Sequence, residues 1–208
     1  MPDFTKLFLK AVKDNEDFQE AIDIIRRNSQ KDSWLIGGFV YRNIASSLYG
    51  TEKAKADLDF IIEKSPDKIL VPRYWKKRLN KYGNPKLFRN DGLEIDFVPL
   101  ENVSSILRRH LKPSIENFLT GTPLTIQSIA YDIKNNCTQG NIGIKALLDK
   151  TVAVNDFEQM KIYSQQFLYN KNKDNKRWGK DGEKIYYFNY CWGNHYLIWH
   201  WSRQLLFG

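Results

Sequence analysis

Three aspartates in the sequence have the type and surroundings that metal chemistry requires. Asp57 and Asp59 lie two residues apart in the segment Asp57-Leu-Asp-Phe-Ile-Ile, whose apolar residues predict a strand. Residues i and i+2 of a strand project from one face, with Cα atoms about 6–7 Å apart. Asp96 lies in a second apolar segment, Leu93-Glu-Ile-Asp-Phe-Val. If the two strands are neighbours, a third carboxylate reaches the same place.

A cluster of three carboxylates indicates divalent cations, because like charges in a partly buried site repel one another until cations neutralise them. Mg²⁺ prefers oxygen ligands and substrate phosphates. Two ions about 3.5–4 Å apart stabilise both the attacking and the leaving oxygens of phosphoryl transfer. We therefore predict Asp57, Asp59 and Asp96 as metal ligands and catalytic residues, with two Mg²⁺ ions, or Mn²⁺, as cofactors. The alternative is a solvated acidic strand, to which Glu94 would also belong.

A glycine pair accompanies the acids. Gly37-Gly38 stands between the predicted strand Ser33-Trp-Leu-Ile and a predicted helix over 39–48. Glycines let backbone N–H groups approach a phosphate, and the start of the helix adds positive potential. A lone Gly-Gly also occurs in ordinary turns. The order of strand, Gly-Gly, helix, Asp-x-Asp and a further aspartate favours a triphosphate site beside the metal site.

The elements that must position these residues follow from apolar spacing and turn signals. Ser65-Pro66 is a typical helix start and predicts a helix to about Tyr82. The turn Asn90-Asp91-Gly92 predicts a hairpin. This alternation predicts an α+β fold, a mixed sheet with flanking helices and a small C-terminal helical extension. We expect two domains, at 1–155 and 156–208. We expect helices at 14–28, 113–118 and 156–169, and strands at 86–89 and 93–98. The segments 124–133 and 141–144 would form either strands or a helix with a hairpin.

These motifs resemble the nucleotidyltransferase superfamily that includes DNA polymerase β. Gly37-Gly38, Asp57-Leu-Asp59 and Asp96 match its active-site signature in order. The likeness is closest to the head domain of bacterial poly(A) polymerases and CCA-adding enzymes, and it covers about residues 30–155. Leu35-Ile-Gly-Gly-Phe-Val-Tyr-Arg-Asn is similar to the Gly-Gly-x-Val-Arg-Asp motif of that group. The segment Leu124-Thr-Ile-Gln-Ser-Ile-Ala-Tyr-Asp is similar to its Asp-Phe-Thr-Ile-Asn-Ala motif, and residues 140–149 resemble the turn that closes the domain.

The resemblance implies transfer of a nucleoside monophosphate from an NTP, such as ATP, to an acceptor hydroxyl, most simply on RNA. It further implies nucleotide binding by Gly37, Gly38, Arg42, Thr125 and Gln127. A second interpretation is nucleotidylation of a small molecule or a protein. A third is a binding module without catalysis, which the departures from the group's motifs at Tyr41, Pro123 and Gln127 would suit.

Basic residues support a polyanionic partner. The chain carries a net charge of +8, and the stretch from Arg73 to Arg89 contains no acidic residue. We predict that Arg73, Lys76, Lys77, Arg78 and Lys81 bind nucleic acid, against the alternative of a solvated helix face. Arg108-Arg109-His110 with Lys112 forms a second cluster, which would contact the triphosphate or the acceptor, or would end a helix favourably.

The remaining features argue for an ordinary intracellular protein. Residues 186–201 are rich in aromatic side chains, which we interpret as core or a dimer contact rather than a base-stacking surface. Cys137, Cys191 and the three histidines show no zinc spacing. No segment has the length of a membrane span, and the N-terminus lacks the pattern of a signal peptide. We therefore expect a cytoplasmic protein without a membrane partner.

Overall fold

The structure is a computed structural model that describes residues 1–29, 31–53, 58–80, 82–174 and 199–200. Side chains are described as far as residue 165. Asp57, Lys81 and most of the C-terminal aromatic segment therefore lie outside the described residues.

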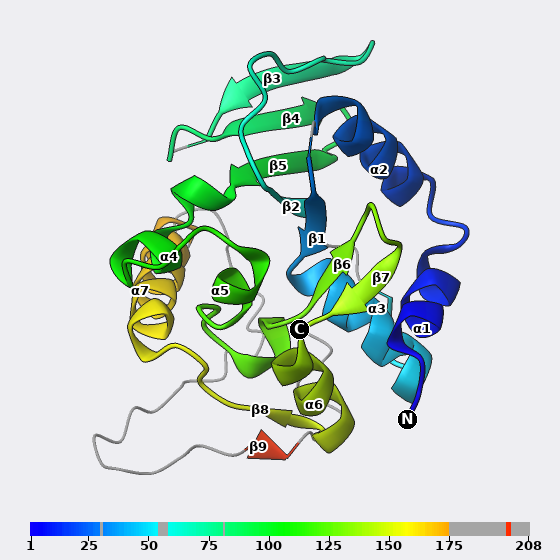
Figure 1. Cartoon of the computed structure of the whole chain (residues 1–208), viewed down its shortest axis with the longest axis vertical. Helices are drawn as coiled ribbons and strands as arrows, with labels where there is room; N and C mark the ends of the chain where they lie inside the picture. The colour runs from blue at the N-terminus through cyan, green and yellow to red at the C-terminus, as the bar shows by residue number, and fades with distance from the viewer. Residues whose placement is uncertain (30, 54–57, 81, 175–198, 201–208) are drawn as a thin grey trace.

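A seven-stranded mixed sheet forms the centre of the fold (Figure 1). Its strands lie in the order β3-β4-β5-β2-β1-β6-β7. β2 and β5 run parallel, and every other neighbouring pair is antiparallel. The strands are β1 (Ser33–Ile36), β2 (Leu58–Ile62), β3 (Trp75–Leu79), β4 (Pro85–Arg89), β5 (Glu94–Pro99), β6 (Ala130–Asp132) and β7 (Cys137–Gln139).

One face of the sheet carries the larger core. Alternate strand residues such as Leu58, Phe60, Ile95 and Phe97 are buried there against helices. The helices are α1 (Phe4–Val12), α2 (Glu16–Asn28), α3 (Gly38–Tyr49) and α6 (Asn141–Asp149). Aromatic rings of α1, α2 and α3 pack on one another within this core, with Phe18 stacked on Phe39 at 5.8 Å between centroids.

Among the described residues, a smaller cover packs on part of the opposite face. Ile61 and Trp34 contact a smaller apolar cluster there that contains Leu100, Ile106 and Leu119. This cover consists of the 3-10 turn η1 (Leu100–Asn102), α4 (Ser104–Arg108) and α5 (Ile115–Leu119). Because Asp59 is two residues before Ile61 on β2, it lies on this same face.

The chain after the sheet forms short elements and one long helix. The 3-10 turn η2 (Thr125–Gln127) precedes β6, and β8 (Thr151–Val152) pairs with β9 (Trp199–His200). Helix α7 spans Phe157–Asp174. None of the helices within the described ranges combines the length and the apolar character that a bilayer crossing needs.

The fold class and most expected elements are confirmed, but the predicted helix from Ser65 to Tyr82 is wrong. Residues 75–79 form the edge strand β3 instead. Pro72 would interrupt a helix there, because proline removes a backbone donor and clashes with the preceding turn. Trp75 then anchors the strand, donating from Nε1 to Glu20 Oε1 at 2.7 Å.

This correction changes the basic surface. On a strand the side chains alternate between faces, so Lys76 and Arg78 share one face and Lys77 takes the other. The alternative of a solvated helix face therefore does not apply to Lys76, Lys77 and Arg78.

Candidate active site

Two of the three predicted acids lie side by side. In the parallel pair β2–β5, Asp59 is the register partner of Asp96. Their chain neighbours Leu58, Phe60, Ile95 and Phe97 are buried in the larger core. Both carboxylates therefore project from the opposite, partly open face, on strands about 4.8 Å apart.

The glycine pair borders the same carboxylates. Ile36 at the end of β1 pairs with Asp59, Gly37 follows, and α3 begins at Gly38. Gly37 has φ +76° and ψ −154°, a conformation that side chains disfavour, and a Cβ built on it would lie 3.3 Å from Asp59 Oδ2. The Asp59 carboxylate thus lies against the backbone where α3 starts, and the positive end of a helix favours a negative charge.

Lys86, which belongs to the basic stretch from Arg73 to Arg89, contacts Asp96. Lys86 on β4 is the register partner of Asp96, and its Nζ lies 3.1 Å from Asp96 Oδ2 and 2.5 Å from Glu94 Oε2. Burial acts to lower the pKa of Lys86, but the two carboxylates outweigh it and raise the pKa. This contact could have been predicted from the sequence, because the predicted hairpin places Lys86 opposite the acids of the next strand.

Further polar residues complete a row across four strands. Arg78, Lys86, Asp96 and Asp59 are successive register partners from β3 to β2. Arg78 Nη2 lies 2.7 Å from Glu94 Oε1. The row therefore runs from two cations at the edge of the sheet to two carboxylates at its centre.

The oxygen donors of Asp59 and Asp96 fit a hard divalent cation, which prefers carboxylates and substrate phosphates. Gly37, which has no side chain, lets the Asp59 carboxylate lie close to the backbone at the start of α3. Within the described residues no group of three acidic, histidine or cysteine side chains gathers in the manner of a metal site. A third carboxylate would come from Asp57, two residues before Asp59 in the chain.

The other residues predicted to bind nucleotide lie on neighbouring elements. Arg42 is exposed on α3, one turn after Gly38. Thr125 and Gln127 lie in η2, which contacts α3 and leads into β6, where Ala130 pairs with Ile36. Both side chains accept a hydrogen bond from a backbone N–H: Thr125 Oγ1 from Ala153 N at 3.0 Å, and Gln127 Oε1 from Leu124 N at 3.2 Å.

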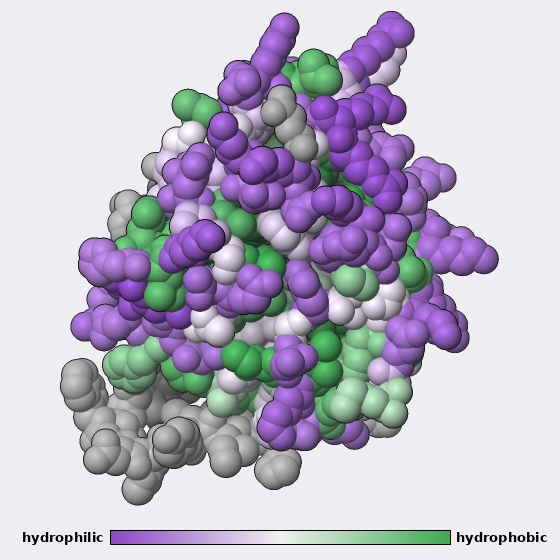
Figure 2. All heavy atoms as spheres, in the orientation of Figure 1, coloured by the Kyte–Doolittle hydropathy of each residue, from purple (hydrophilic) through white to green (hydrophobic). Residues whose placement is uncertain are grey.

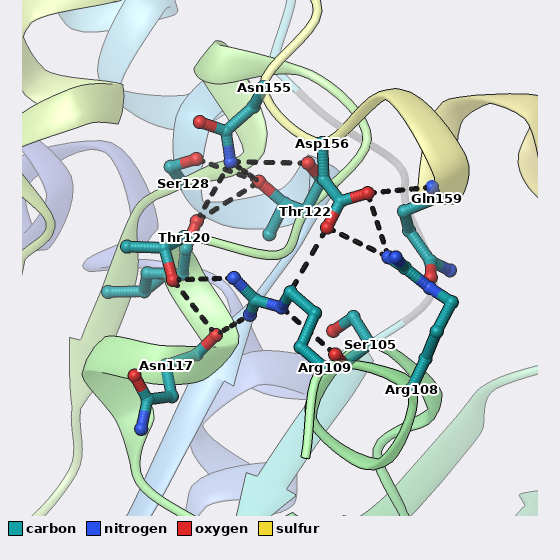
Figure 3. Close-up of polar contacts among 11 residues, drawn as sticks. Ser105, Arg108, Arg109, Asn117, Thr120, Thr122, Ser128, Asn155, Asp156 and Gln159 are labelled. Carbon is teal, nitrogen blue, oxygen red and sulfur yellow. Dashed lines mark hydrogen bonds and ion pairs between the residues drawn. The ribbon is translucent and has the colours of Figure 1, made fainter. Parts of the chain in front are cut away.

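Arg108 and Arg109 converge on Asp156 (Figure 3). Arg108 Nη2 lies 2.7 Å from Asp156 Oδ1, and Arg109 Nε lies 3.8 Å from Oδ2. Arg109 also donates to Asn117 O and Thr120 Oγ1. Of the two roles expected for this cluster, these contacts favour the structural one, which joins α4 and α5 to the start of α7.

The edge of the sheet presents the predicted nucleic-acid-binding residues. Lys76, Lys77 and Arg78 on β3 are exposed. Neither Lys76 nor Lys77 has an ion pair within the described part of the chain. Just before β3, Arg73 lies over the ring of the exposed Tyr74 at 4.9 Å from its centroid. Over β3 to β5 the visible surface is mainly hydrophilic (Figure 2).

Comparison with known proteins gives matches in structure only. The sequence matches no model of a protein family, and no curated protein is similar to it at a significant level. A CCA-adding enzyme solved with CTP is 17% identical at a TM-score of 0.56, over 81% of this chain and 40% of that one. The Thermotoga maritima CCA-adding enzyme complexed with tRNA is 18% identical at a TM-score of 0.54, over 83% of this chain and 40% of that one. A CCA-adding enzyme solved with ATP is 18% identical at 0.55, over 85% and 42%.

This chain thus spans less than half the length of the enzymes it matches. The agreement includes the mixed sheet and its flanking helices, which the sequence motifs had led us to expect. This chain therefore has the fold of the matched part of the CCA-adding enzymes.

Proposed function

We propose that this chain is a metal-dependent nucleotidyltransferase that moves a nucleoside monophosphate from an NTP to a hydroxyl of an RNA acceptor. The observation that carries the proposal is the register pairing of Asp59 with Asp96 on one face of the sheet, beside Gly37 at the start of α3. The fold shared with enzymes solved with CTP, ATP and tRNA supports it.

In this proposal Asp57, Asp59 and Asp96 hold two Mg²⁺ ions. When bound, the ions neutralise charge on the phosphates and lower the pKa of the acceptor hydroxyl. The N–H groups of Gly37 and Gly38 bind the triphosphate, with Arg42, Thr125 and Gln127 around it. Asp96 accepts the proton of the acceptor hydroxyl, whose oxygen forms a bond to the α-phosphorus. The bond from that phosphorus to the bridging oxygen breaks, and pyrophosphate leaves.

The RNA acceptor is supported by the charge of the sheet edge. Lys76 and Arg78 project from the face that carries Asp96 and Asp59, so a strand bound over them would reach the acids. Arg73 and Lys77 extend the positive surface. Lys81 is included among the proposed RNA-binding residues only because of its position in the sequence. Contacts with phosphates of this kind weaken steeply as salt rises.

The test is transfer of label from an NTP carrying it on the α-phosphate, with Mg²⁺ and a short RNA. We expect label on the RNA from the unmodified protein and none from Asp59→Asn. Asp23→Asn, which removes an exposed acid on α2, is the matched control and should transfer normally. Unlabelled RNA throughout would contradict the RNA proposal.

Two other acceptor classes are outcomes of the same experiment. Label on an aminoglycoside or on the protein itself would replace RNA by small-molecule or protein nucleotidylation. Binding of NTP with no transfer to any acceptor would favour the module without catalysis. The RNA proposal also predicts that Lys76→Gln weakens oligonucleotide binding and reduces its salt dependence by about one unit of slope.

A further inference from the structure

Lys86 stands between two carboxylates of one strand. Glu94 and Asp96 are two residues apart on β5, so both project toward the same face as Lys86. The Lys86 side chain is 16% exposed, and its Nζ contacts Glu94 Oε2 at 2.5 Å and Asp96 Oδ2 at 3.1 Å. An ammonium group has three donors, which lets it bind both carboxylates at once.

This contact affects the proposed metal site directly. Lys86 lies on one Asp96 oxygen, and the amide of Asn80 lies 3.4 Å from the other. A divalent cation bound to Asp96 would face the ammonium at short range, where like charges repel strongly in a partly buried site. A metal ion at Asp96 therefore opposes the contact between Lys86 and this carboxylate.

We infer that Lys86 is an internal counter-cation of Asp96, which moves onto Glu94 when a divalent cation binds at Asp96. The inference rests on the proposed function. Glu94 can receive the lysine because it already contacts it, and Arg78 holds the other Glu94 oxygen at 2.7 Å. Lys86 is therefore a positioning residue. Its contact with Glu94 keeps the free-energy cost of leaving Asp96 small, because the ammonium stays paired with a carboxylate.

This exchange of Lys86 from Asp96 to Glu94 would link metal binding to nucleotide binding. Without metal, Lys86 neutralises part of the charge of the adjacent Asp59 and Asp96. A metal ion alone must displace the lysine, so it binds weakly. A metal ion that arrives with a triphosphate gains the phosphate contacts near Gly37 as well, and these favour the displacement.

The test measures binding of Mn²⁺ alone to the full-length chain by electron paramagnetic resonance, which requires no catalysis. Lys86→Gln should lower the Kd for Mn²⁺ by about tenfold, and Glu94→Gln should raise it by about tenfold. Lys86→Arg keeps the charge and should retain the weak binding of the unmodified protein. Lys145→Gln removes a lysine paired with Asp149 on α6 and should leave the Kd unchanged.

The double variant separates the exchange from a direct effect of charge. If Glu94 acts through Lys86, Glu94→Gln in the Lys86→Gln background should change the Kd by less than about twofold. Additive effects would overturn the inference, as would an unchanged Kd in Lys86→Gln. These results leave the proposed function intact if Asp59→Asn abolishes Mn²⁺ binding. If neither the unmodified protein nor Lys86→Gln binds Mn²⁺, or if binding is equal after Asp59→Asn, the proposed metal site itself fails.

Discussion

Asp156 joins two parts of the molecule, and its substitution tests whether Arg108 and Arg109 are structural. The carboxylate is only 9% exposed. It pairs with Arg108 on α4, and its Oδ1 accepts from the N–H of Gln159 at 2.9 Å in the first turn of α7. Its loss would leave both arginines without this partner and α7 without a cap.

The expected loss of stability follows from these contacts. A helix cap contributes about 1 kcal/mol, and a hydrogen bond to a charged group contributes about 1.5–3 kcal/mol. Asp156→Asn keeps the shape and part of the cap, so we expect a loss of about 2 kcal/mol. Asp156→Ala removes both contacts and should lose about 3 kcal/mol. Urea unfolding at constant slope measures both values.

The effect should depend on pH in one direction. Burial acts to raise the pKa of Asp156, but the hydrogen bond from Gln159 and the charge of Arg108 outweigh it, and the pKa lies below its ordinary value. The unfolded value is about 3.9. The stabilisation is therefore complete above this value and is lost as pH falls through the lower folded pKa. The difference between the native protein and Asp156→Asn should shrink toward acid pH.

A matched control is Asp149→Asn, which removes an exposed carboxylate from its pair with Lys145. This variant should unfold at the same urea concentration as the native protein, because exposed pairs contribute little. Equal stability of Asp156→Asn and Asp149→Asn would refute the structural role. Intact stability with lost NTP binding in Asp156→Asn would instead place the arginines at the triphosphate.

Three further predictions concern the glycines and the acids. Gly37→Ala should lose about 1–3 kcal/mol in urea unfolding from its backbone conformation alone, and should weaken Mn²⁺ binding because the new methyl group crowds Asp59. Gly140→Ala should lose about 3 kcal/mol or more in the same measurement, since φ is +117° and the added Cβ would lie only 2.3 Å from Ser128 O. Mg²⁺ and NTP at about 100 times their Kd should stabilise the native protein by about 2.7 kcal/mol, as measured by thermal unfolding, and should not stabilise Asp59→Asn.

The parts of the fold that the sequence predicted well are those with local signals. The strand at Ser33–Ile36, the Gly-Gly turn and the helix after it depend on residues within a short stretch. The hairpin of β4 and β5 depends on its turn residues in the same way. Strand β3 was missed because four of its five residues are exposed, which leaves no apolar alternation to detect.

The site depended on contacts that local patterns do not contain. The adjacency of Asp59 and Asp96 requires the parallel pairing of β2 with β5, and these strands are separated along the chain by β3 and β4. The attachment of Arg108 to Asp156 joins residues 48 positions apart. Register partners across a hairpin, such as Lys86 and Asp96, form the intermediate case. Their register can be predicted from the sequence once the turn is located. Whether they form an ion pair depends on which face of the sheet the core covers.

The alternation of β2 and β5 explains how one pair of strands serves both stability and chemistry. Leu58, Phe60, Ile95 and Phe97 bury one face in the larger core, which fixes the register that brings Asp59 beside Asp96 on the other. A one-residue slip of either strand would turn its acid into the core, where an unpaired charge is very unfavourable. The packing on one face therefore excludes the registers that would separate the acids on the other. Among the described residues, the α4–α5 cover packs on Ile61, two residues after Asp59, and the side chain of Asp96 remains 20% exposed.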